Sequence, residues 1–112
     1  MSSMRDHKLY FDDIYEAIVK VEKYTAGLTF VKFQKNSLVV DGVVRNLEII
    51  GEASKRIPSR VKSESFDIEW KKIAGLRDIL AHEYFGVDLE VLWDIVKNKL
   101  PDLKKKMVTL RK

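Results

Sequence analysis

The spacing of apolar residues along the chain follows the period of an amphipathic helix. Apolar side chains recur every three or four residues over residues 8–26, 37–57, 70–84 and 89–110. Gly27, Pro58 and Gly86 follow the first three stretches, and both residue types end helices. We therefore predict an all-α fold, an antiparallel bundle of four long helices that each bury one apolar stripe.

Two segments between the long helices are less regular. Residues 28–36, LTFVKFQKN, alternate as a strand does, but a lone strand would lack a pairing partner. We predict one short helix here instead, entered through Thr29. Residues 59–67, SRVKSESFD, are predicted to be a polar connector.

Polar residues at the starts of the last two long helices suggest their caps. Ser65 or Asp67 is predicted to cap the third helix, and Asp88 the fourth. Pro101 lies inside the fourth stretch and lacks a backbone N–H. The fourth helix is therefore expected to kink or restart at this proline.

Composition narrows the class of protein. With 112 residues, the chain is predicted to be a single domain, residues 1–112. Its 21 basic and 17 acidic residues give a net charge of +4, which permits a nucleic-acid partner without requiring one. There is no cysteine, no apolar stretch long enough to span a membrane, and no apolar core of the signal-peptide type behind MSSMRDHK. We expect a cytoplasmic protein without membrane contact.

The stretch WKKIAGLRDILAHEY, residues 70–84, places an arginine in an apolar face. That face consists of Trp70, Ile73, Ala74, Leu80, Ala81 and Tyr84. Arg77 lies near its middle, and a buried guanidinium requires an anionic partner. Either Glu52 or Glu48 of the preceding helix turns inward as a structural ion partner, or Arg77 lines a site that expects an anion. The charged side of that helix can equally be a solvated ladder, with Glu52 and Arg56 as an i,i+4 pair.

His82 supplies the second chemical group of this helix. Arg77 and His82 are turned about 140° from each other around a helix axis, so they converge only at the helix end or with the help of a second subunit. Asp78 precedes His82 by four residues, where its carboxylate can fix the imidazole tautomer. Gly75 and Ile79 fall on the outer side of the helix, as a second packing surface in a dimer would require.

An arginine with an oriented histidine suits attack of an RNA 2′-hydroxyl on its neighbouring phosphate. The histidine would move the proton and the arginine would stabilise charge on phosphorus. The same two residues can also be a structural ion pair and a helix-capping histidine, so their spacing alone does not establish an enzyme. Only His7 and His82 are available as imidazole ligands and no G-x-S-x-G elbow is present, so neither a metal site nor a serine hydrolase is predicted.

The string WKKIAGLRDILAHEYFGVDLEVLWDIV, residues 70–96, resembles the HepT-like branch of the HEPN superfamily, whose signature is R-x-x-x-x-H-x-Y. Arg77, His82 and Tyr84 supply the signature, and Asp78 is the polar residue that commonly follows the arginine. RNLEIIGEASKRIP, residues 45–58, is similar to the central helix of that family. The resemblance extends over roughly residues 8–107.

This resemblance implies a homodimer that acts as a metal-independent ribonuclease on tRNA or mRNA without a cofactor. It implies Arg77 and His82 as catalytic residues across a dimer cleft, with Asp78 supporting them. Glu52 is the further supporting residue that the charge of Arg77 itself suggests, independently of the resemblance. It also implies a toxin–antitoxin pairing with an MNT-type minimal nucleotidyltransferase, which would silence the toxin by transferring AMP to Tyr84. The alternative is a non-catalytic helical subunit that binds the nucleotidyltransferase and a nucleotide, with Arg77 as a phosphate ligand.

Overall fold

A computed structural model describes residues 4–65, 67–82 and 88–111, without the side chains of residues 4–6 and 77–82. Within these ranges every regular element is helical, which confirms the predicted all-α class. The long helices are α1 (Met4–Thr25), α3 (Ser37–Arg56) and α5 (Trp70–His82). The fourth is a composite of α6 (Leu89–Asp94), the π-helical segment η2 (Ile95–Lys99) and α7 (Leu100–Leu110).

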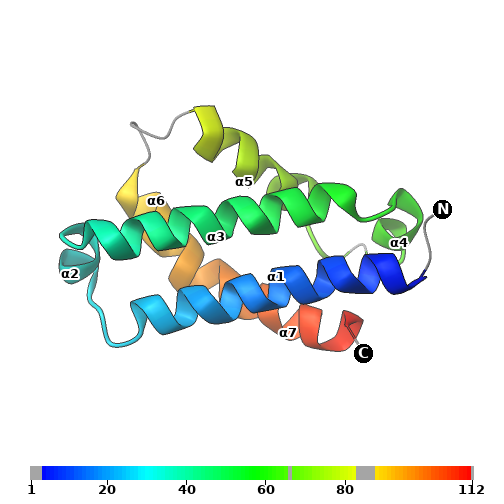
Figure 1. Cartoon of the computed structure of the whole chain (residues 1–112), viewed down its shortest axis with the longest axis horizontal. Helices are drawn as coiled ribbons and strands as arrows, with labels where there is room; N and C mark the ends of the chain where they lie inside the picture. Colours follow the sequence, from blue (N-terminus) through cyan, green and yellow to red (C-terminus); the bar gives the residue numbers. More distant parts are fainter. Residues whose placement is uncertain (1–3, 66, 83–87, 112) are drawn as a thin grey trace.

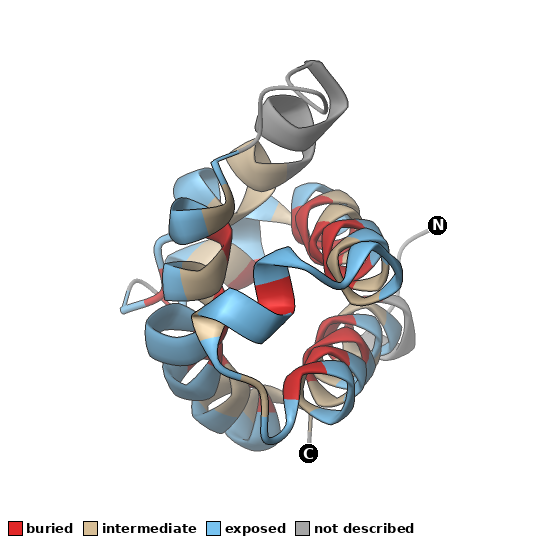
Figure 2. Ribbon diagram, turned by 90° about the vertical axis from the view of Figure 1, so that its left-hand side faces the viewer, coloured by how far each residue is buried: buried red, intermediate tan, exposed pale blue. Residues whose placement is uncertain are grey.

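The helices are arranged around α3 and α1, which run antiparallel side by side (Figure 1). α5 packs against α3, while α7 packs against α1, and each member of these pairs again runs opposite to its neighbour (Figure 1). Buried positions on α1 and α3 face the space enclosed by the helices (Figure 2). The fully buried residues include Ile14, Ile18, Val21, Phe33, Val43, Leu47, Ile50 and Met107. The predicted periodicity therefore corresponds to one shared apolar core.

The helix boundaries of the first half agree with the predicted local signals. Gly27 has a φ of 75°, a left-handed conformation that lets the chain leave α1 without strain. The Thr29 hydroxyl accepts a hydrogen bond from the Lys32 N–H at 3.2 Å, and the short helix α2 (Phe30–Gln34) follows. α3 ends at Arg56, because Pro58 forces the preceding Ile57 into an extended conformation.

The segment predicted as a polar connector contains a second short helix, α4 (Ser59–Ser63). Val61 is buried at 7% exposure and packs into the core. The segment is helical because this one apolar side chain has a place in the core, a tertiary contact that a largely polar sequence does not announce.

The predicted cap of the third long helix is wrong. α5 begins at Trp70, whereas the Ser65 carbonyl accepts a hydrogen bond from the Ile68 N–H in a preceding turn. Ser65 and Ile68 are both 5% exposed, so this turn is held by burial. Helical bonding starts only at Glu69, whose carbonyl accepts from Ile73. Gly86, the predicted end of this helix, lies outside the described residues.

The fourth helix passes through Pro101 by changing its hydrogen-bond register. The Leu100 N–H donates to the Ile95 carbonyl, five residues earlier, which is the π-helical pattern. Asp88 caps the start of α6 as predicted, because its carboxylate accepts from the Glu90 N–H at 2.9 Å. The predicted kink is thus a π-helical turn that absorbs the missing proline N–H.

Basic residues of α7 fasten it to α1. Lys104 Nζ lies 2.8 Å from a Glu22 carboxylate oxygen, and Arg111 Nε lies 2.7 Å from an Asp12 carboxylate oxygen. The Arg111 guanidinium also lies 4.1 Å from the ring centroid of Tyr15. Part of the basic charge at this end of the chain is therefore used inside the fold. None of the described helices is long and apolar enough to cross a membrane.

Candidate functional site

The first turns of α5 fix the position of this helix, which carries Arg77, Asp78 and His82 further along. Trp70 is buried at 6% exposure and stacks on Phe11 of α1, with ring centroids 6.2 Å apart. Ile73 packs against the core one turn later. The stacking ties the start of α5 to α1, while the helix as a whole packs against α3, and together these contacts set the direction in which α5 continues.

The backbone of Arg77, Asp78 and His82 belongs to this same uninterrupted helix. The predicted helical setting is therefore confirmed for Arg77, Asp78 and His82. The side chains of these residues, and Tyr84 as a whole, lie outside the described part of the chain. Convergence of Arg77 and His82, pairing of Arg77 with Glu52, and the dimer surface at Ile79 stay predictions.

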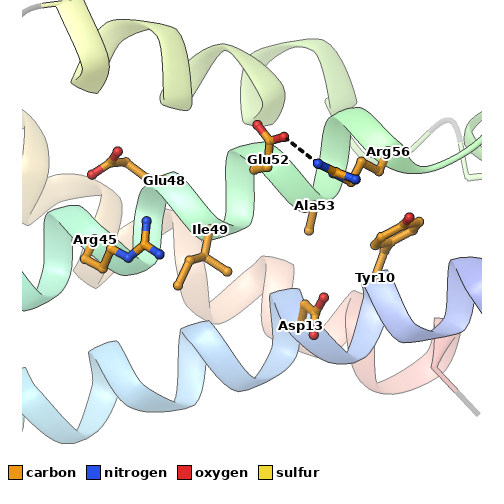
Figure 3. A pocket seen from close by; sticks show the side chains of 8 residues that line it. All are labelled: Tyr10, Asp13, Arg45, Glu48, Ile49, Glu52, Ala53 and Arg56. Atoms are coloured by element: carbon orange, nitrogen blue, oxygen red, sulfur yellow. Dashed lines mark hydrogen bonds and ion pairs between the residues drawn. The ribbon is translucent and has the colours of Figure 1, made fainter.

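A groove of about 540 Å³ lies along α3, the helix against which α5 packs. Its described lining residues come from α1 and α3 (Figure 3). They are Tyr10, Asp13, Arg45, Glu48, Ile49, Glu52, Ala53 and Arg56. Ile49 and Ala53 form apolar parts of the wall, and charged side chains surround them.

Glu52 and Arg56 form the clearest polar contact in this groove. Arg56 Nη2 donates to a Glu52 carboxylate oxygen at 3.3 Å, which confirms the predicted i,i+4 pair. Hydrogen bonding to Tyr10 and to Glu52 raises the pKa of Arg56 above its usual value. In Figure 3 the Glu52 side chain rises from α3 on the side of α5, whereas Glu48 extends along α3. Glu52 is therefore the α3 carboxylate directed to the helix that carries the signature.

The groove has a mixed charge. Arg45 and Arg56 contribute two positive groups, against the carboxylates of Asp13, Glu48 and Glu52. Burial, and then the neighbouring Asp12, raise the pKa of Asp13. Three carboxylates beside two guanidinium groups do not make a uniform anion site, so the groove by itself is a poor place for a phosphate.

Sequence reasoning left the charged side of α3 open between a solvated ladder and an inward-turned Glu52 or Glu48, and it did not predict the groove. Arg45, Ile49, Glu52 and Arg56 follow one another at intervals of three or four residues, so they share a face of α3. That spacing was a usable signal. The spacing on α3 could not show where α1 lies, and Tyr10 and Asp13 of α1 form the other side of the groove.

A metal centre was not predicted, and no set of ligands suggests one in the part of the chain that the structure describes. Among those residues, no group of three or more histidine, cysteine, aspartate or glutamate side chains is placed to hold an ion.

Comparison with known proteins gives a single answer. The family described as "Ribonuclease HepT-like" matches residues 14–110. The chain belongs to this family. The resemblance read from the signature is therefore confirmed, and with it the assignment to a family of ribonucleases.

Curated relatives carry names of the same kind. "Probable ribonuclease HepT" of Thermococcus cleftensis is 47% identical over 108 residues, which cover 96% of this chain and 98% of the relative. "Putative RNase MJ1380" of Methanocaldococcus jannaschii is 40% identical over 105 residues, 94% of this chain and 96% of the relative. No solved structure matches the chain.

A further relative shows this kind of domain within a longer chain. "Gamma-glutamylcyclotransferase and putative RNase MJ0434" of Methanocaldococcus jannaschii is 40% identical over 106 residues. The match covers 95% of the present chain but 48% of the relative. The HepT-like sequence therefore accounts for about half of that protein.

Proposed function

We propose that this HepT-like protein is a toxin endoribonuclease that cleaves tRNA or mRNA in the cytoplasm without a metal ion. The observation that carries the proposal is the placement of Arg77, Asp78 and His82 on one continuous helix, in a chain that matches the ribonuclease HepT-like family over residues 14–110. Tyr84, two residues after His82, completes the signature in the sequence.

The proposed reaction is an internal displacement at phosphorus. The imidazole of His82 accepts the proton of an RNA 2′-hydroxyl while the 2′-oxygen forms a bond to the adjacent phosphorus. The bond from phosphorus to the 5′-oxygen breaks, and that oxygen takes up a proton. The guanidinium of Arg77 stabilises the charge that develops on the phosphoryl oxygens. The products are a 2′,3′-cyclic phosphate and a 5′-hydroxyl.

Assembly of the site is proposed to need two copies of the chain. Arg77 and His82 are turned about 140° from each other around α5, so one helix does not aim both at the same phosphate. A homodimer in which the two α5 helices border a common cleft would bring an arginine and a histidine together. Asp78 would hold the tautomer of His82, and Glu52, directed toward α5, would position Arg77.

Regulation is proposed to act through Tyr84. An MNT-type minimal nucleotidyltransferase, as antitoxin, would transfer AMP to the tyrosine hydroxyl. The new phosphodiester would carry negative charge close to Arg77 and would occupy the place of the RNA phosphate.

The decisive experiment is cleavage of bulk tRNA and of an mRNA transcript by the purified protein and by His82→Ala. We expect the substitution to preserve the helical circular dichroism spectrum and to lower the cleavage rate by roughly a hundredfold or more, as loss of a general base does. Lys71→Ala, an exposed position on the same helix, is the matched control and should cleave as the wild type does. The ends of the products should be 2′,3′-cyclic phosphates.

A folded His82→Ala variant that cleaves RNA as fast as the wild type would overturn the catalytic assignment. RNA that stays intact with the wild-type protein at every concentration, together with co-purification of a nucleotidyltransferase, would instead favour the non-catalytic subunit.

A further inference from the structure

The corner where α3 ends and α4 begins concentrates positive charge. The segment KRIPSRVK, residues 55–62, contains four basic residues and no acidic one. They are Lys55 and Arg56 in the last turn of α3, and Arg60 and Lys62 in α4. Only Ile57 and Pro58 separate the two helices, so all four residues lie at the same end of the bundle (Figure 1).

This charge is open to solvent. Lys55 and Arg60 are exposed, Lys62 is half-buried, and the side chain of Arg56 is 59% exposed although it bonds to Glu52. Neither Arg60 nor Lys62 forms an ion pair with any side chain that the structure describes. By contrast, Lys104 and Lys106 of α7, and Arg111 directly after it, each meet a carboxylate. The corner therefore presents Arg60 and Lys62 without a carboxylate partner among the described side chains, whereas these three basic residues near the end of the chain are already neutralised.

The chemistry of the corner fits the phosphate backbone of a nucleic acid. Clustered arginine and lysine side chains bind successive phosphates by releasing counterions, and the planar guanidinium groups can each meet two phosphate oxygens. The neighbouring groove, with its three carboxylates, is less suited to that role. The position of the corner is also favourable, because α5 begins just eight residues after Lys62 and is only about 20 Å long. The corner therefore lies on the N-terminal side of the helix that carries the signature residues, separated from it by one short connecting segment.

We propose that the α3–α4 corner binds the phosphate backbone of the RNA substrate, with Arg56, Arg60 and Lys62 as its principal contacts. The inference rests on the proposed ribonuclease function and adds a docking surface to it. Arg56 is prepared for the role, because Glu52 and Tyr10 hold its guanidinium while most of the side chain faces solvent. The contacts would carry no base specificity, and they would fix the position of the strand along α5.

The test measures binding of bulk tRNA by fluorescence anisotropy in the His82→Ala background, where the RNA stays intact. R60E/K62E should lower the affinity by about tenfold or more at low salt. The slope of log affinity against log salt concentration should decrease by about two, one for each lost phosphate contact. The matched control is K32E/K35E, which makes the same change of charge at two exposed positions, one in α2 and one at its C-terminal cap, at the opposite end of the molecule (Figure 1). It should bind within about twofold of the parent at physiological salt, where distant charges are screened.

In the protein with His82 intact, R60E/K62E should raise KM for RNA much more than it lowers kcat, because the corner binds substrate and does not touch the reacting atoms. R60Q/K62Q is a second variant that keeps the test valid if charge reversal prevents folding.

Equal affinity of R60E/K62E and K32E/K35E for tRNA, whether both are weak or both are strong, would overturn the inference. If the wild type cleaves RNA and the corner variant binds and cleaves like the control, only the corner fails. If His82→Ala does not change cleavage, or no cleavage occurs, the proposed function fails whatever the corner binds.

Discussion

The two sides of α3 are stabilised by different interactions, apolar burial on one side and charged contacts in water on the other. Val43, Leu47 and Ile50 face the interior and are completely buried. On the other side, Arg45 and Arg56 border a groove and remain exposed, and the contact between Glu52 and Arg56 is an open i,i+4 pair at 3.3 Å. One side excludes water, whereas the other organises charge in contact with water.

This difference separates stability from chemistry within a single helix. Burial of an aliphatic side chain contributes on the order of 2 kcal/mol, while an exposed ion pair contributes a few tenths. Substitutions of the exposed charged residues on the groove side should therefore change the free energy of unfolding only slightly. The charged side chains there and at the α3–α4 corner can serve ligand binding, because the stability of the bundle does not depend on them.

The largest expected effect on stability comes from the interior side. Leu47→Ala should lower the free energy of unfolding by about 2–5 kcal/mol, because it removes buried methyl groups and leaves a cavity. Chemical denaturation monitored by circular dichroism measures the change. Leu38→Ala, at a position of the same helix that is 82% exposed, is the control and should change stability by under about 0.5 kcal/mol. Similar losses in both variants would show that α3 does not have a distinct buried side.

A smaller loss of stability is expected where a basic side chain at the end of one helix pairs with a carboxylate of another. Arg111→Ala should lower the free energy of unfolding by clearly less than Leu47→Ala does, since it removes the contact to Asp12 and the contact with the Tyr15 ring but no buried apolar group. Thermal unfolding gives the change, and Lys105→Ala, at an exposed position of α7, is the control. A double-mutant cycle with Asp12→Ala isolates the ion pair, and a coupling energy of zero would mean that Arg111 stabilises the fold through the ring contact and not through Asp12.

The smallest effect concerns the groove carboxyl of Asp13, whose pKa burial and Asp12 raise. A raised pKa means that the folded state binds the proton more tightly than the unfolded state does, so this group opposes folding increasingly as the pH rises through the raised pKa. Asp13→Asn should therefore be slightly more stable than the wild type at neutral pH, by under about 0.5 kcal/mol after solvent screening.

That advantage should disappear at a pH below the usual aspartate pKa, where the carboxyl is protonated in both states. Urea midpoints measured across this pH range test the sign. Glu16→Gln, at an exposed carboxyl of α1, is the comparison. An Asp13→Asn variant that is less stable than the wild type at neutral pH would show that the ionised carboxyl stabilises the groove.

Local signals in the sequence accounted for most of the helices. The apolar period located the four long helices, and Thr29 and Asp88 marked two starts because a cap acts on backbone groups only two or three residues away. The errors fell where the deciding contact is distant. α4 depends on burial of Val61, and the late start of α5 depends on burial of Ser65 and Ile68. Neither is visible from neighbours in the chain.

For the candidate site, the sequence by itself determined that Arg77, Asp78 and His82 share a helix in a HepT-like chain, because the signature and the helical period are both local. Only the tertiary structure decided that α3 has a groove on its charged side and that α1 supplies Tyr10 and Asp13 to it. It also decided that Lys104, Lys106 and Arg111 meet carboxylates, whereas Arg60 and Lys62 of the α3–α4 corner meet none among the described side chains. Grooves and ion pairs join residues that are distant in the chain, and their positions depend on how whole helices pack.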